Sequence, residues 1–210
     1  MLAPKIRQIP AKTRGPKIFF LALAASRLLA QTAWAGDIER KFSIELTYER
    51  HGLIFKLKPF DYTYLTKTQR VDFLAGKKFK TGWGDLRAFA YLKIDNHNQS
   101  WLGTRVDFGR KALRERLNLD LELRFFQGLN GKSGNHFYVI PSAYYTLDKK
   151  GRFTIGPSGY GKKVFGEKPF FYLGLDGLIK LSSSLSTLVS YSRDTYGSGD
   201  MLWWILYFDF

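Results

Sequence analysis

Hydrophobic and polar residues alternate along most of the chain beyond residue 36. In the clearest segment, Leu117, Leu119, Leu121, Leu123 and Phe125 alternate with residues that are mostly polar or charged. A period of two, rather than 3.6, is typical of a β-strand with one dry face and one wet or ion-paired face. The same alternation recurs in four other segments, over residues 42–49, 86–94, 101–108 and 171–181.

This pattern predicts an all-β fold with about ten strands, and eight to twelve as the range. The strands are expected near residues 40–50, 52–64, 69–79, 84–95, 99–109, 114–127, 136–147, 168–182, 185–194 and 201–210. Segments of this length can cross a bilayer as tilted strands, and lipid forces them to close because every backbone polar group needs a partner. We therefore expect a transmembrane antiparallel up-and-down β-barrel. A soluble β-sandwich or lipocalin-like barrel has the same alternation along any one strand, so periodicity alone does not say which face points outward.

Residues 1–35 have the organisation of a secretory signal peptide. Five Lys and Arg residues precede an apolar stretch that starts at Ile18 and is interrupted by Arg27, and an Ala-Trp-Ala sequence ends at Ala35. The apolar part is too short for a membrane-spanning helix of about 20 residues. A disordered basic arm or an amphipathic surface helix is the alternative. Cleavage after Ala35 removes six of the 33 Lys and Arg residues and no acid, so the formal net charge falls from +15 to +9 over the barrel domain, residues 36–210.

The chain ends with a segment whose alternate residues are all large and apolar. They are Leu202, Trp204, Leu206, Phe208 and Phe210. This segment resembles the terminal strand of bacterial outer-membrane β-barrel proteins, in which such an alternation is read by the barrel-assembly machinery. The resemblance covers about ten residues closely and implies a location in the bacterial outer membrane, among its lipids and lipopolysaccharide. A soluble protein would rarely end on so apolar an edge strand, because such an edge invites aggregation.

An even number of strands would place both termini on the periplasmic side. The connections at 95–100 and 182–184 would then be periplasmic turns, and the basic, Gly-rich segment 148–167 would be a flexible extracellular loop. This segment lacks the strand–helix context of a phosphate-binding loop. Its cations could instead attract lipopolysaccharide phosphates or a protein partner.

The charged residues of the alternating segments would face the lumen of such a barrel. They are Glu45, Arg87, Lys93, Arg105, Asp107, Asp120, Glu122, Arg124, Asp176 and Lys180. A ten-stranded barrel is only slightly wider inside than one that its own side chains fill. Charges of both signs in this space predict an ion-pair network that plugs the barrel, with a narrow charge-lined pore as the alternative.

Few residues have the spacing of a chemical site. The chain has no Cys, and His51, His97 and His136 lie far apart without acidic partners at metal-ligand spacing, so we expect no metal and no cofactor. Ser190 and Ser192 are the candidate nucleophiles for acyl transfer, but no His lies at their height on a neighbouring predicted strand. Binding of nucleic acid is not expected, because the basic residues lie between membrane strands instead of on one soluble face.

Taken together, these patterns predict a small outer-membrane barrel that is not an enzyme. We expect it to be a structural or accessory barrel that binds a protein partner in an envelope assembly through its loops and outer wall. A narrow porin-like diffusion channel is the first alternative. A lipid-modifying outer-membrane enzyme is the second.

Overall fold

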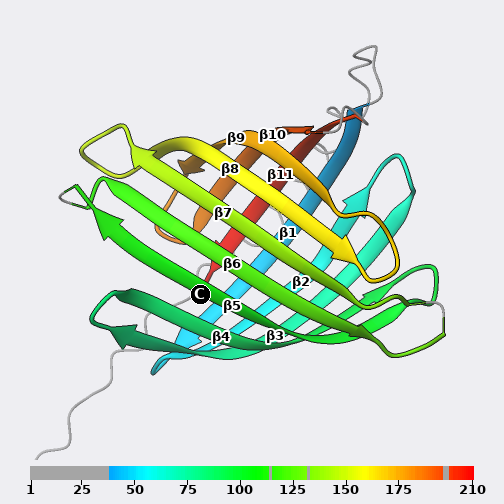
Figure 1. The fold of residues 1–210 in the computed structure, drawn as a ribbon. Helices are drawn as coiled ribbons and strands as arrows, with labels where there is room; N and C mark the ends of the chain where they lie inside the picture. The colour runs from blue at the N-terminus through cyan, green and yellow to red at the C-terminus, as the bar shows by residue number, and fades with distance from the viewer. Residues whose placement is uncertain (1–37, 114, 132, 196–198) are drawn as a thin grey trace, which may run out of the picture. The chain divides into compact units, whose positions relative to one another are not determined.

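The computed structural model describes residues 38–113, 115–131, 133–195 and 199–210. These residues form eleven strands that close into one barrel (Figure 1). The strands are β1 (Ile38–Arg50), β2 (Leu53–Thr63), β3 (Thr68–Thr81), β4 (Gly84–Asp95), β5 (Ser100–Ala112), β6 (Leu117–Gly128), β7 (His136–Thr146), β8 (Phe153–Val164), β9 (Phe170–Lys180), β10 (Leu185–Asp194) and β11 (Asp200–Asp209). In this part of the chain, no helix is long and apolar enough to cross a membrane. The predicted signal peptide, residues 1–35, lies outside the described residues.

Closure occurs between the first and last strands, which run parallel. Every other pair joins consecutive strands in antiparallel orientation, and the β1–β11 ladder runs from Ile38↔Asp200 to Thr47↔Asp209. An odd strand number makes this unavoidable, since each hairpin reverses the direction of the chain. The barrel therefore has an N-terminal rim, where β1 begins, and a C-terminal rim, where β11 ends. The expectation that both termini lie on one side is wrong, because the two rims are at opposite ends of the barrel.

The prediction of a closed all-β barrel with eight to twelve strands is confirmed, but the number is eleven, not ten. The additional strand is β8, which occupies most of the segment expected to be an extracellular loop, 148–167. The actual connection is short and covers residues 147–152. Because β8 adds one reversal, the connections at 96–99 and 181–184 lie on opposite rims, and not on the same side as expected.

Glycine explains why β8 can form despite a sequence that looks like a loop. A Cβ atom at Gly156 would overlap the carbonyl oxygen of Ala143 on β7, so only glycine allows the two strands to approach this closely. Gly159 and Gly161 face outward, and a Cβ atom at either would lie 2.8–2.9 Å from the ring of Phe171 on β9. The aromatic ring thus covers backbone that the two glycines leave bare, a device that stabilises glycine-containing strands.

Two connections show how tightly the C-terminal rim turns. The β1–β2 hairpin uses His51 and Gly52, both with positive φ (52° and 77°), as expected for the type I′ turn that matches the twist of paired strands. In the 147–152 connection, the backbone N–H groups of Phe153 and Arg152 donate to Asp148 Oδ1 at 2.9 and 2.7 Å. These hydrogen bonds hold the pKa of Asp148 below its ordinary value.

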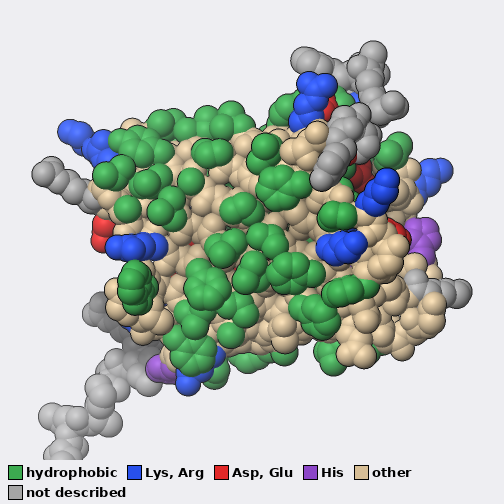
Figure 2. All heavy atoms as spheres, viewed as in Figure 1, with side chains coloured by type: hydrophobic (Ala, Val, Ile, Leu, Met, Phe, Trp, Pro, Cys, Tyr) green, Lys and Arg blue, Asp and Glu red, His purple; other side chains and the backbone are tan. Residues whose placement is uncertain are grey.

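The two faces of the wall have opposite character. On β6, the leucines of the alternating segment and Phe125 face outward, whereas Glu122 and Arg124 face inward, where they pair with each other and Glu122 also pairs with Arg105 on β5. Figure 2 shows apolar side chains covering the middle of the visible wall, with most of the charged side chains toward its two ends. Leu102, Leu173 and Phe55 are each exposed over about half of their surface, at 53%, 57% and 51%. The outside of the barrel is therefore its apolar side.

Gly156→Ala should destabilise the barrel by about 1–3 kcal/mol, because the added methyl group forces β7 and β8 apart. The measurement is urea unfolding followed by tryptophan fluorescence. Gly82→Ala is the matched control, since nothing lies within 4 Å of its Cβ position. Equal stability of the two variants would contradict the close β7–β8 approach.

Candidate functional site

The inside of the barrel contains a cavity of about 900 Å³. Its lining includes Asp85, Lys111 and Asp209 at the C-terminal rim, and reaches inward to Tyr160 and, along β10 and β11, to Ser192 and Met201. The cavity therefore opens at the C-terminal rim. We call it the lumen cavity.

One wall of the lumen cavity begins with a carboxylate held by two lysines. Glu45 on β1 is 2% exposed, and its oxygens lie 2.6 Å from Lys56 Nζ and 3.2 Å from Lys58 Nζ, both on β2. The β2–β3 register shifts between Lys58 and Asp61, a position that includes Pro59, which has no N–H to donate to the ladder. This bulge lets both Lys58 and Asp61 face inward. The two lysines thus supply counter-charges for the buried carboxylate.

The same wall continues with a network of two arginines and two acids on β5 and β6. Arg105 donates from Nε to Asp107 at 2.7 Å, and its Nη2 lies 2.8 Å from Glu122. Arg124 pairs with the other oxygen of Glu122. Glu122 therefore joins two arginines that face each other across the β5–β6 ladder. Without it, two buried like charges would lie side by side.

The opposite wall, on β7 to β10, is mainly uncharged. Its one central charge is Asp176, which accepts hydrogen bonds from Tyr144 Oη at 2.6 Å and Ser158 Oγ at 2.7 Å. Ser190 lies directly across the β9–β10 ladder from Asp176, and Ser192 is two positions further along. The lumen cavity is thus lined by ion pairs on one side and mainly by hydroxyl groups on the other.

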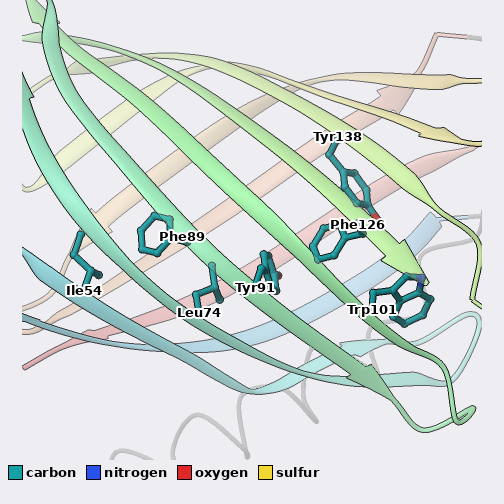
Figure 3. Close-up of a cluster of buried hydrophobic side chains, with 7 residues drawn as sticks. All are labelled: Ile54, Leu74, Phe89, Tyr91, Trp101, Phe126 and Tyr138. Carbon is teal, nitrogen blue, oxygen red and sulfur yellow. The ribbon is translucent and has the colours of Figure 1, made fainter. Parts of the chain in front are cut away.

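Beyond the floor of the cavity, aromatic rings fill the lumen. We call this group the aromatic plug, and it consists of Tyr91, Trp101, Phe126, His136 and Tyr138 together with Lys93. Tyr91 and Phe126 are 1% and 0% exposed, and their ring centroids are 4.7 Å apart in an edge-to-face arrangement. Figure 3 shows the rings of Tyr91, Trp101, Phe126 and Tyr138 together with Ile54, Leu74 and Phe89, which extend the same apolar cluster over β2 to β7.

Two glycines make room for these rings. Gly103 lies opposite Phe126 in the β5–β6 ladder, and a Cβ atom there would be 2.7 Å from the Phe126 ring. Gly76 stands in the same relation to Phe89, since a Cβ atom there would overlap the Phe89 ring. Each ring therefore lies against its neighbour's backbone, which lets large side chains fit inside a narrow barrel.

Lys93 places a cation in the middle of the plug. Its Nζ lies 4.5 Å from the ring centroid of Trp101 and 4.7 Å from that of Phe126. The same Nζ is 3.2 Å from Nε2 of His136. Desolvated cation–π contacts of this kind contribute about 2 kcal/mol or more. Lys93 is 6% exposed, so the surrounding side chains shield it almost completely from water.

A second lysine connects strands that are not neighbours. Lys41 on β1 places its Nζ 5.9 Å from the ring centroid of Tyr160 on β8 and 5.9 Å from that of Trp203 on β11. The Tyr160 ring in turn lies 5.5 Å from that of Tyr138 in the plug. Because β1 and β8 are separated around the barrel by three other strands, the Lys41–Tyr160 contact crosses the lumen, whereas Trp203 is the direct partner of Lys41 in the β1–β11 ladder.

The structure distributes the predicted lumen residues over several levels. Arg87 and Asp120 line the lumen cavity toward its mouth. Lys93 belongs to the plug. Lys180 is exposed at the end of β9, opposite Ser186, and is not among the residues that line the cavity. The remaining members, Glu45, Arg105, Asp107, Glu122, Arg124 and Asp176, form the walls described above.

The predicted terminal signal lies on the outside of β11. Its five residues, Leu202, Trp204, Leu206, Phe208 and Phe210, alternate with residues that face the lumen. The ring of Trp204 is 5.4 Å from that of Phe42 on β1. The backbone N–H of Phe210 donates to the carbonyl oxygen of Thr47 at 2.9 Å, so the strand is paired to its end.

The residues considered for catalysis do not come together. Ser190 and Ser192 line the lumen cavity, whereas the ring of His136 is stacked on Phe126 in the plug, and its Nδ1 lies 3.0 Å from the carbonyl oxygen of Gly134. Among the described residues, no hydrogen bond joins either serine to a histidine. In the same part of the chain, no three His, Asp or Glu side chains are grouped closely enough to hold a metal ion.

Several functional positions were not anticipated from the sequence. Lys41, Lys56, Lys58 and Asp72 face the lumen from strands whose alternation is weak or contains a bulge. Asp72 accepts a hydrogen bond from Tyr91 Oη at 2.5 Å, which fixes the plug to β3. A signal for the plug existed, because Phe89 and Tyr91 occupy the charged face of an otherwise clear alternation.

No protein-family model and no curated protein matches this chain.

Glu122→Gln should lower the free energy of unfolding by about 3–5 kcal/mol, because it leaves two buried arginines without their shared counter-charge. Urea unfolding followed by tryptophan fluorescence measures the loss. Glu115→Gln is the control, since its pair with Lys111 is exposed and worth about 0.5 kcal/mol. A loss below about 1 kcal/mol for Glu122→Gln would show that the network does not depend on this carboxylate.

Proposed function

We propose that the protein is an integral outer-membrane barrel with a closed lumen and a structural or accessory role in the cell envelope. The observation that carries this proposal is the distribution of side chains, with large apolar groups outside and charged groups inside. Leu175 is 53% exposed on the outer wall, whereas Arg105 and Asp176 are 8% and 5% exposed inside. A soluble barrel has the reverse arrangement. An apolar exterior is favoured in a lipid bilayer.

The connections support an orientation for this barrel. The shortest turns, 51–52 and 82–83, lie on the C-terminal rim, and the longest connection, 129–135, lies on the N-terminal rim. Outer-membrane barrels have short turns on the periplasmic side and longer loops outside. We therefore assign the C-terminal rim to the periplasm and the N-terminal rim to the cell exterior.

A closed lumen favours an accessory role over transport. The aromatic plug and the Lys41 contacts fill the lumen beyond the floor of the cavity. Binding through rims and outer wall is then the activity that the barrel can offer, with lipopolysaccharide or a protein of the envelope as partner. In this proposal the barrel-assembly machinery reads the outward residues of β11.

A diffusion channel is the second candidate, and the lumen cavity favours it. The cavity is wide and lined by both signs of charge, so a displaced plug would leave a polar path through the barrel. The two candidates differ only in whether the plug stays in place, which conductance measures directly.

The full chain should fractionate with outer membranes and run as a faster band before boiling than after it. The reason is that a closed barrel in which every strand is paired resists sodium dodecyl sulfate until it is heated. A soluble periplasmic protein without a band shift would contradict the membrane proposal.

The wild-type barrel should pass no steady ion current in planar bilayers, whereas the double variant Trp101→Ala, Phe126→Ala should. Removing the two rings takes away the faces on which Lys93 is held and opens the plug. Trp83→Ala is the control, because this ring is 81% exposed in a turn. A steady current through the wild type would instead establish the channel.

A further inference from the structure

The outer wall has a hollow over β1 to β5 that differs from the rest of the apolar surface. It is a groove of about 550 Å³ whose lining is almost entirely apolar. Its floor is formed by Ala75 and Ala90, which are direct partners in the β3–β4 ladder. Phe55 borders the floor on the β2 side, and Phe73 and Leu102 border it toward the N-terminal rim.

The groove exists because small side chains are placed between large ones. Phe55, Ala75, Ala90 and Thr104 are consecutive cross-strand neighbours on the outer face. The neighbouring row consists of Leu57, Phe73, Leu92 and Leu102. Phe55 and Phe73 are exposed over 51% and 46% of their surface, so their rings stand up as walls beside the alanine floor. An apolar chain is the kind of group that such a hollow accommodates.

Toward the C-terminal rim, two cations lie just beyond the residues that line the groove. Arg50, Leu53 and Lys77 form one cross-strand row on the outer face, next to the row of the alanines. Lys77 is exposed, and its Nζ lies 5.7 Å from the ring centroid of Phe79, one step nearer the rim. A lysine that extends over an apolar wall toward the polar edge is snorkelling, which presents its charge at the level of lipid headgroups.

We propose that this groove binds one anionic glycerophospholipid, with an acyl chain on the alanine floor and the phosphate between Lys77 and Arg50. Both requirements of that ligand are present, since the hollow is apolar and its rim end is basic. The assignment rests on the proposed membrane location. In the proposed orientation, the site faces the periplasmic leaflet.

Native mass spectrometry of the full chain, extracted in mild detergent and then titrated with defined lipids, tests the proposal. The probes are phosphatidylglycerol, phosphatidylcholine and lipid A. Ala90→Leu fills the floor, and Ala143→Leu is its matched control, because Ala143 lies on the outer face of β7 opposite Leu119. Lys77→Gln removes the cation, with Lys163→Gln, on the outer face of β8 near the N-terminal rim, as its control.

We expect the wild type to retain one phosphatidylglycerol in preference to phosphatidylcholine. Ala90→Leu should weaken retention of both lipids about tenfold, and Lys77→Gln should weaken phosphatidylglycerol alone by about fivefold. The two controls should behave as the wild type. A heat-modifiable band for each variant shows that it still forms the barrel.

Equal retention by Ala90→Leu and Ala143→Leu would overturn the site, and so would retention of lipid A in place of phosphatidylglycerol. If the protein still fractionates with outer membranes and shows the heat-dependent band shift, either of these results leaves the proposed function intact. Failure of the wild type to reach the membrane would overturn both proposals.

Discussion

The structure depends on the parallel ladder between β1 and β11. It pairs the two strands that would otherwise be edges, so each strand of the described barrel has two neighbours. In lipid an open edge is not tolerated, because its N–H and C=O groups have no water to bind. Closure with an odd number of strands also places the two ends of the barrel wall on opposite rims. The mouth of the lumen cavity lies at the rim where β11 ends.

Inside this wall, the lumen combines two ways of stabilising buried polar groups. In the walls of the lumen cavity, Glu122 and Glu45 each pair with two cations, so buried charges that would be costly alone have a counter-charge. Deeper in the barrel, Lys93 and Lys41 lie over aromatic rings. The two kinds of contact meet at the arginines, since Arg105 lies 5.6 Å from the ring centroid of Phe89 and Arg124 lies 5.8 Å from that of Tyr91. The closed state thus follows from where the aromatic residues occur along the inward faces.

The alternation of residues was enough to predict a closed barrel, and ten of the strands overlap those predicted. The alternation did not predict β8, because Gly156, Gly159 and Gly161 lower the strand propensity of this segment. Tertiary contacts, such as that of the Phe171 ring, stabilise the strand instead. Missing this one strand made the predicted number of strands even instead of odd. Every connection after β8 was therefore assigned to the wrong rim. The walls of the lumen were partly predictable, because charges on one face of a strand mark the wet side. The aromatic plug was not predictable, because the pairing register of the strands decides whether rings on different strands meet.

The apolar face of this barrel lies outside and its charged face lies inside. The chain contains no Cys, so single cysteines can be introduced and spin-labelled without background. The most direct measurement is the collision of such labels with oxygen, which concentrates in lipid, and with a water-soluble nickel chelate, in reconstituted vesicles. Labels at Leu102 and Leu175 should collide mainly with oxygen, and a label at Ser190 mainly with the nickel chelate or with neither. Labels at Leu102 and Leu175 that collide mainly with the nickel chelate would contradict a lipid-facing outer wall and indicate a soluble barrel.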